Sequence, residues 1–483
     1  MAAADDSLDP PQRRTVIPIV PASGGLYKAE KTIHPREVKG RFATWRWVFV
    51  ALTQLAFYGL PWLQWNARQA VLFDLASRRF YIFGLVLYPQ DFIYLAALLV
   101  VSACSLFLFT AVAGRLWCGF ACPQTVYTEI FLWVERRLEG DRSARIRLDA
   151  SPWTADKLRR RGSKHVAWIL IAFWTGFTFV GFFTPIHTLA AETAHLAFGP
   201  WEWFWVLFYA FATWGNAGFM REQVCKYMCP YARFQSAMFD RDTMIVSYDP
   251  RRGEPRGARA KSVGHAALAG LGKGECIDCS LCVQVCPTGI DIRKGLQYEC
   301  IGCAACVDAC DGVMDKMSYP RGLIRFATEN GLEKGWTRAE MIRHVFRPRV
   351  LVYTGVLVAI LGSIGTQLAT RAPFRVDVIR DRGALARQVE QGRIENVYRL
   401  QVMNVSEQPR HFHVSVTGLE GIVVASTPEL DVDSAQERWL AVRVQVPFDS
   451  AQAAGPGVHA IHFRIDVPSG DGVSEKSTFV IPR

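Results

Sequence analysis

Long apolar segments alternate with charged segments over most of the chain. Five of them reach about 20 residues, the length that a helix needs to cross a bilayer, and they are apolar on all faces rather than along one stripe. Buried core helices are usually shorter and amphipathic. The pattern therefore predicts five transmembrane helices, over Trp45–Leu63, Phe92–Ala113, Val166–Thr184, Trp201–Phe219 and Val350–Ala369. An apolar patch at Ile130–Val134 leaves a sixth span open, but it looks too short.

The last part of the chain, residues 371–483, has a different pattern. Short runs there alternate apolar and polar residues and are separated by turn residues, which is typical of strands in a sandwich. The runs are Tyr398–Val405, His411–Val416, Trp439–Val446, His459–Val467 and Thr478–Ile481. Since no Cys follows Cys310, we expect an immunoglobulin-like sandwich without an inter-sheet disulfide.

Lys and Arg are concentrated in every second connecting segment, as the positive-inside rule requires. Eight lie in the N-terminal segment through Arg46; three lie in 64–91, eleven in 114–165, none in 185–200 and nine in 221–261. This predicts a cytoplasmic N-terminus, a cytoplasmic 220–349 region and an exported C-terminal domain. The formal net charge of +11 therefore follows membrane topology and does not indicate nucleic-acid binding.

Eight of the thirteen Cys form two runs with the spacing of bacterial ferredoxins. The runs are Cys276-x-x-Cys279-x-x-Cys282-x-x-x-Cys286-Pro287 and Cys300-x-x-Cys303-x-x-Cys306-x-x-x-Cys310. In two-cluster ferredoxins the fourth Cys of each run ligates the other cluster. We therefore predict two [4Fe–4S] clusters. The first ligand set is Cys276, Cys279, Cys282 and Cys310, and the second ligand set is Cys300, Cys303, Cys306 and Cys286. Two zinc sites are the alternative, but zinc does not call for the third and fourth Cys at these spacings.

A second cysteine motif, C-x-x-x-C-P, occurs twice in the membrane region. It contains Cys118 and Cys122 after the second span, and Cys225 and Cys229 after the fourth span. Residues four apart lie on one face of a helix, so each pair could approach one ion. We predict a copper site formed by these four C-x-x-x-C-P cysteines. A disulfide and simple packing at helix ends are the competing interpretations.

Other cofactor motifs do not occur. The chain has no Walker A motif, and Gly270–Gly274 does not form the dinucleotide-binding pattern. No His lies within the five predicted spans, which argues against a haem held by two helix histidines. Residues 1–40 are polar and lack the apolar core of a signal peptide, so we interpret the N-terminal segment as a cytoplasmic tail.

The chain resembles the FixG/RdxA/CcoG-type cytochrome c oxidase accessory proteins of bacteria. The resemblance rests on the run Cys276–Pro287, the block Gly295–Cys306, both C-x-x-x-C-P motifs and the exported β domain. It implies a polyferredoxin-like protein of the inner membrane that reduces Cu(II) to Cu(I) and supports assembly of a cbb-type oxidase. It also implies a cytoplasmic electron donor, a copper-transporting P-type ATPase and oxidase assembly factors as partners.

The sequence thus predicts a multi-domain protein with an α-helical membrane bundle, an α+β bacterial-type two-cluster ferredoxin domain and an all-β immunoglobulin-like sandwich. We expect a tail (1–44), a four-span region (45–240), the ferredoxin domain (241–345), a fifth helix (346–370) and a periplasmic sandwich (371–483). Two other functions stay open. One is an electron conduit to a periplasmic reductase, as in nitrate and nitrous oxide reductase systems, and the other is a non-enzymatic assembly scaffold.

Overall fold

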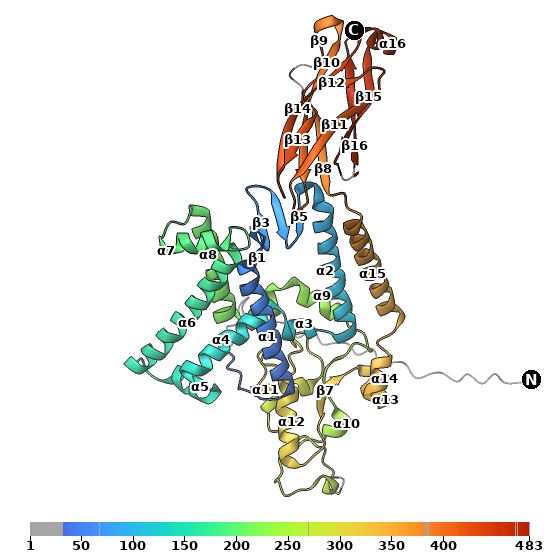
Figure 1. Cartoon of the computed structure of the whole chain (residues 1–483). Helices are drawn as coiled ribbons and strands as arrows, with labels where there is room; N and C mark the ends of the chain where they lie inside the picture. The colour runs from blue at the N-terminus through green and yellow to red at the C-terminus, as the bar shows by residue number, and fades with distance from the viewer. Residues whose placement is uncertain are drawn as a thin grey trace, which may run out of the picture.

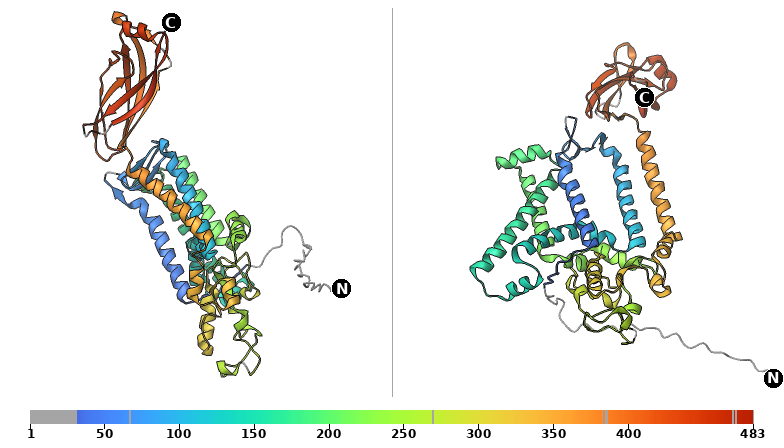
Figure 2. Two further views of the ribbon diagram at one scale, coloured as in Figure 1. Left: turned by 90° about the vertical axis from the view of Figure 1, so that its right-hand side faces the viewer. Right: turned by 60° about the horizontal axis from the view of Figure 1, so that its bottom comes forward.

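The computed structural model of the chain describes residues 32–66, 68–268, 270–381, 383, 386–468, 470 and 472–482. Figure 1 shows three parts in a row, with helices in the middle, a β-sandwich at one end and a small α+β domain at the other. Figure 2 shows that the sandwich extends away from the helical bundle along its long axis. Most of the predicted N-terminal tail lies outside the described residues.

The bundle contains a helix at each predicted span. The helices are α1 (Arg41–Gly59), α2 (Phe92–Ala113), α6 (Ala155–Val180), α8 (Pro200–Thr213) and α15 (Pro348–Ala369). Among the described residues, three helices are long and apolar enough to cross a membrane: Pro89–Ala113, Ala155–Val180 and Pro348–Ala369. The other two predicted spans, at α1 and α8, stay predictions.

The structure differs from the sequence prediction at the third and fourth spans. Helix α6 begins at Ala155, well before Val166, because Thr154 caps its first turn by accepting a hydrogen bond from the Lys157 amide. The helix therefore includes His165. The fourth span is not one regular helix: α8 continues into the π-helical segment η3 (Trp214–Met220), which ends at Arg221 with a positive φ of 36°.

The region between the second and third spans forms helices that the apolar pattern did not reveal. These are α3 (Leu116–Phe120), α4 (Pro123–Glu139) and α5 (Arg142–Ala150). Helix α4 is amphipathic and buries Phe131 and Val134. A sixth span is therefore not needed to explain the apolar patch at Ile130–Val134, because it forms the buried face of a helix that ends at charged residues.

The ferredoxin domain is built around a short antiparallel pair, β6 (Ile245–Tyr248) with β7 (Ile324–Ala327), in which Val246 pairs with Phe326. Between these strands lie α11 (Leu281–Gln284) and α12 (Ala305–Met317). Helix α12 packs Val313 and Met314 against the strands in one buried core. The strands thereby bring the two ends of the cysteine-rich segment together.

The C-terminal domain is a two-sheet sandwich, as predicted. One sheet has the order β12–β14–β10–β8 with β9 beside β10, and the other has the order β13–β11–β15–β16. The long strands are β8 (Phe374–Arg380), β10 (Ile394–Asn404), β11 (Arg410–Thr417), β14 (Glu437–Val446), β15 (Gly457–Asp466) and β16 (Gly472–Ile481). The short strands are β9 (Arg387–Gln388), β12 (Val423–Val424) and β13 (Glu429–Val432). The alternating pattern puts Tyr398, Phe412 and Phe463 in the core between the sheets.

A small sheet connects the sandwich to the bundle. It consists of β3 (Val71–Asp74), β4 (Arg79–Ile82) and β5 (Leu85–Leu87), in the segment between the first two spans. Asp91, which is 2% exposed, forms ion pairs with Arg371 at 2.5 Å and Arg375 at 2.7 Å. Contacts from the loop before the second span thus fix the start of the C-terminal domain.

Candidate iron–sulfur centres and the adjoining cysteine site

The two predicted ligand sets line two separate cavities in the ferredoxin domain. The first cavity is lined by all four Cys of the first ligand set, together with Tyr248 and Arg293. The second cavity is lined by all four Cys of the second ligand set, with Cys282 at its edge. The fourth Cys of each run therefore lies with the first three of the other run, because α12 carries Cys310 back to the first loop.

The loops around the cavities repeat the same backbone geometry. In the first loop, Asp278 and Ser280 on either side of Cys279 have positive φ angles of 54° and 56°. In the second loop, Gly302 and Ala304 flank Cys303 with φ angles of 69° and 57°. Left-handed residues of this kind turn backbone N–H groups toward one centre, which favours binding of an anion such as an iron–sulfur cluster. The donor set and the backbone therefore fit a cubane in each cavity.

The thiols in these cavities lie in a dry environment. Burial raises the pKa of Cys282 to about 11 and the pKa of Cys300 and Cys310 to about 12. Burial also raises the pKa of Cys303, although the positive charge of Arg46 acts in the opposite direction. None of the thirteen cysteines forms a disulfide. Thiols buried in this way are suited to metal binding, which removes their protons.

The C-x-x-x-C-P cysteines do not lie on continuous helices, so the prediction that each pair shares one helical face was wrong. Cys118 is within α3, but Cys122 is extended, with a ψ of 131°, and precedes α4. Cys225 is within the π-helical segment η4 (Val224–Met228), and Cys229 is extended before α9 (Pro230–Met238). The proline that follows each second cysteine disfavours helical backbone there.

The two C-x-x-x-C-P segments nevertheless come together. Cys118 is close enough to Cys225, and Cys122 to Cys229, for each pair to interact electrostatically. The amide of Gln124 donates hydrogen bonds to the carbonyl oxygens of Asn216 (3.0 Å) and Arg221 (3.1 Å), which joins the start of α4 to η3. The internal repeat in the sequence therefore forms one four-cysteine group.

This group lies directly against the second cavity. A Cβ atom added to Gly119 would be 2.8 Å from the backbone of Cys303, so α3 touches the cluster-binding loop at a position where only glycine fits. Cys118 and Cys225 pack against the same buried cluster that contains Cys303 and Val285. Ferredoxin domain and membrane region thus meet at the cysteines of both motifs.

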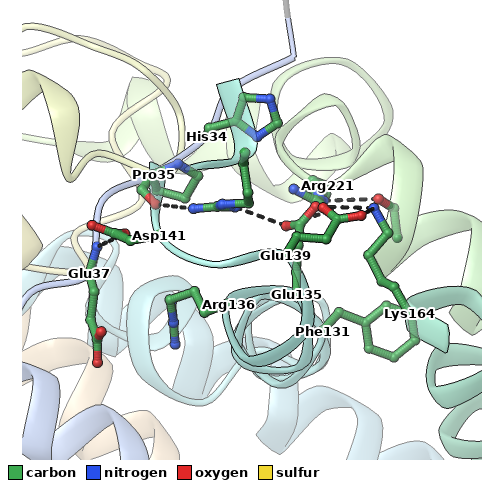
Figure 3. A network of polar contacts seen from close by, with 12 residues as sticks. His34, Pro35, Glu37, Phe131, Glu135, Arg136, Glu139, Asp141, Lys164 and Arg221 are labelled. Atoms are coloured by element: carbon green, nitrogen blue, oxygen red, sulfur yellow. Dashed lines mark hydrogen bonds and ion pairs between the residues drawn. The ribbon is translucent and has the colours of Figure 1, made fainter. Parts of the chain in front are cut away.

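A buried charge network holds the two segments in position (Figure 3). Glu135 on α4 accepts hydrogen bonds from Arg145 (2.9 Å) and from Arg221 (3.1 Å), four residues before Cys225. Lys164 forms an ion pair with Glu139 at 2.8 Å. Arg145 also donates to the carbonyl oxygen of Pro35 at 2.6 Å. The network therefore links α4, α5, α6, η3 and the segment before α1.

The four-cysteine group is not a preformed site for a single metal ion. Within the described part of the chain, no three His, Cys, Asp or Glu side chains are positioned to hold one ion together. The same holds for His187 and His195, the histidines at the other end of the bundle. His165 stacks on Phe219, with ring centroids 5.7 Å apart. Metal binding by the four-cysteine group therefore requires movement of its side chains.

The sequence also predicted no role for Arg46, Arg115 or Glu135. They were hidden because a single arginine or glutamate carries no motif, and only the packing of α1, α3 and α4 on the ferredoxin domain brings them to the site. The one available signal was that Arg46 lies inside a predicted span, where a charged side chain is expensive.

Bundle, cavities and sandwich together define a membrane iron–sulfur protein with a two-cluster ferredoxin domain. Three sequence families match the chain: "4Fe-4S binding domain" at residues 95–140, "4Fe-4S dicluster domain" at 220–329 and "IG-like fold at C-terminal of FixG" at 364–482. The chain belongs to the FixG/RdxA family.

The relatives FixG and RdxA support this assignment. Nitrogen fixation protein FixG of Rhizobium meliloti is 41% identical over 427 residues, which cover 82% of this chain and 81% of FixG. Protein RdxA of Cereibacter sphaeroides is 38% identical over 458 residues, covering 92% of this chain and 95% of RdxA. A crystal structure of a FixG-related protein from Vibrio parahaemolyticus, 24% identical, covers 22% of this chain and 95% of its own, with a TM-score of 0.20.

Proposed function

We propose that this protein is a cupric reductase that gives one electron to Cu(II) and produces Cu(I) for a cbb-type oxidase. The proposal rests on one observation: the four-cysteine group packs against the cluster-binding loop around Cys303. Electron transfer needs short distances between donor and acceptor, and this contact supplies one between the ferredoxin domain and soft sulfur ligands.

The cluster ligands are part of the proposal. We propose that the first ligand set binds one [4Fe–4S] cluster and that the second ligand set binds the other; each cluster supplies reversible one-electron transfer when bound. The residues around them hold the loops: Arg293 binds Asp291 at 2.8 Å beside the first cavity. Arg115 reaches the carbonyl oxygen of Cys300 beside the second cavity.

The chemistry of the four-cysteine group suits copper as a substrate. Cu(I) prefers thiolate and thioether ligands, so reduction would increase the affinity of the ion for this group. Burial raises the pKa of Cys118 to about 12 and of Cys225 to about 11. These thiols are therefore protonated at neutral pH until an ion binds and displaces their protons.

The proposed topology follows the charge pattern. The ferredoxin domain would face the cytoplasm, where a donor delivers electrons, and the sandwich would face the periplasm of the bacterial inner membrane. A copper-transporting P-type ATPase and oxidase assembly factors are the proposed partners. The ion pairs of Asp91 with Arg371 and Arg375 support a fixed platform for docking at the periplasmic side.

A direct assay tests the proposal. Protein purified without oxygen is reduced with dithionite, freed of excess reductant and mixed with Cu(II) and a chromophore specific for Cu(I). We expect Cu(I) to form with oxidation of the clusters, and we expect Cys118→Ala with Cys225→Ala to abolish it while iron content and folding are retained. If that double variant keeps the wild-type rate, the four-cysteine group is structural. If the wild type forms no Cu(I), the protein is an electron conduit or a scaffold.

A further inference from the structure

Arg46 is a buried cation without a partner. It lies in the second turn of α1 and is 7% exposed. The structure records no hydrogen bond or ion pair between its side chain and any described residue, and its Nε is buried and unpaired. An uncompensated buried charge is strongly unfavourable, so an anion that the chain itself does not provide is expected beside it.

Three other buried cations in this region have a carboxylate partner. Arg145, Arg221 and Lys164 are all bound to Glu135. Glu129, which lines a cavity together with Arg46, forms its ion pair with Arg136 at 3.4 Å. Arg46 therefore differs from its neighbours, and the protein has not supplied it with a carboxylate.

Arg46 faces the second ligand set. Arg46 lines one cavity together with Cys303, Pro287 and Cys225. It also lines a different, neighbouring cavity with Val285 and Ala305, the residues next to Cys286 and Cys306 in the chain. Its charge acts on the sulfur of Cys303. Helix α1 is fixed there because Asp308 of α12 accepts hydrogen bonds from the amides of Phe42 (3.1 Å) and Ala43 (2.7 Å).

A [4Fe–4S] cluster with four thiolates is an anion, and it gains one more negative charge on reduction. A neighbouring fixed cation therefore stabilises the reduced form and raises the reduction potential, since potentials depend on net charge and solvent exposure. We propose that Arg46 is the counter-ion of the cluster held by the second ligand set and raises its reduction potential above that of the other cluster.

The surroundings of the first ligand set are different. The arginine that lines its cavity, Arg293, is ion-paired with both Asp291 (2.8 Å) and Asp278 (2.5 Å). The two carboxylates offset the positive charge of Arg293. The cluster next to the four-cysteine group is thus the one with the uncompensated cation, and it accepts an electron more readily.

This inference rests on the proposed ligand sets but not on copper reduction, and a redox titration monitored by EPR tests it. We expect two resolved midpoint potentials in the wild-type protein. Arg46→Gln should make the reduction equilibrium of the higher-potential cluster at least tenfold less favourable, which lowers its midpoint potential by about 59 mV for one electron. The lower midpoint potential should not change. Arg46→Lys, which keeps the charge, should retain most of the higher potential.

A matched variant tests the surroundings of the first ligand set. Asp278→Asn removes one carboxylate from Arg293 and should raise only the lower potential. A single shared potential in the wild type would overturn the proposal even if Arg46→Gln did not assemble. The proposal would also be overturned if Arg46→Gln and Arg46→Lys changed the higher midpoint potential equally, or if Arg46→Gln shifted both midpoint potentials. Iron content of each variant separates these outcomes from failure of the ligand assignment.

Discussion

Gly119 lies against Cys303 so closely that a Cβ atom at Gly119 would be 2.8 Å from the Cα atom of Cys303. The contact joins a short helix of the membrane region to the loop that binds the second ligand set. In the cluster-binding loop, Gly302 has a φ of 69°, and a Cβ atom added to it would be 3.1 Å from the backbone of Arg115. Two glycines thus allow two backbones to meet next to the four-cysteine group.

Gly119→Ala is expected to separate the four-cysteine group from the second ligand set. The added methyl group meets backbone atoms, which cannot rotate away as a flexible side chain can, so α3 must shift. Because a displacement of about 1 Å can reduce a rate up to roughly a hundredfold, we expect Cu(II) reduction to fall by roughly ten- to a hundredfold. Iron content should stay at the wild-type level.

Gly162→Ala is the control for that variant. Gly162 is also helical, in α6, but a Cβ atom there meets nothing within 4 Å. We expect its copper reduction and melting temperature to match or slightly exceed those of the wild type, since alanine favours helix over glycine. A Gly119→Ala protein with the wild-type rate would show that the close contact is unimportant for reduction.

The cluster content can be measured directly. Protein purified without oxygen should contain about eight iron and about eight acid-labile sulfide per chain, the stoichiometry of two cubanes. Cys279→Ser should lose about half of the iron, because Cys279 belongs to one ligand set only. Cys104→Ser, which changes a cysteine outside both ligand sets, should lose none. Zinc in place of iron would contradict the assignment.

The proposed sidedness predicts the behaviour of fusion reporters. A reporter that is active only in the periplasm should be active when fused after residue 483 and inactive when fused near Ser262. The physical reason is that Lys and Arg are retained on the cytoplasmic side during insertion. Reporters that are active only in the cytoplasm should give the opposite result. If the periplasmic reporter is inactive after residue 483, the sandwich lies in the cytoplasm and cannot have the proposed docking role in the periplasm.

The charge network around Glu135 should be important for stability. Glu135→Gln leaves Arg145 and Arg221 without their shared carboxylate, and breaking a buried ion pair costs about 3–5 kcal/mol. We expect a clear drop in the unfolding temperature of the protein in detergent. Asp156→Asn, which removes a carboxylate that pairs only with exposed arginines of α6, should have almost no effect. Equal melting temperatures for the two variants would contradict the prediction.

The same network predicts how stability depends on pH. Burial raises the pKa of Glu135, but the charges of Arg221, Arg145 and Lys164 outweigh it, so the pKa is lowered below the ordinary glutamate value of 4.5. A lowered pKa in the folded state contributes stability above the unfolded pKa, and this contribution is lost as pH falls through the folded pKa. Melting temperatures should therefore decrease below about pH 4.5 in the wild type, and less so in Glu135→Gln.

The sequence by itself determined the parts of this protein and the chemistry of its centres. Cysteine spacing predicted two clusters because ligand geometry is local to each loop, and uniform apolar stretches indicated helices at five places because bilayer thickness fixes their length. Alternation in residues 371–483 predicted the sandwich because side chains on a strand alternate between two faces. The second span, Phe92–Ala113, has the bounds of α2.

Only the tertiary structure decided how these parts meet. Spacing alone suggested that Cys118 and Cys122 share a helix, but the proline after Cys122 makes that residue extended, and packing of the two repeats brings Cys225 to Cys118 instead. Arg46, Gly119 and Glu135 act through contacts between segments far apart in the chain. Such contacts depend on the relative position of whole helices, which no local pattern specifies, and they are what joins the four-cysteine group to the second ligand set.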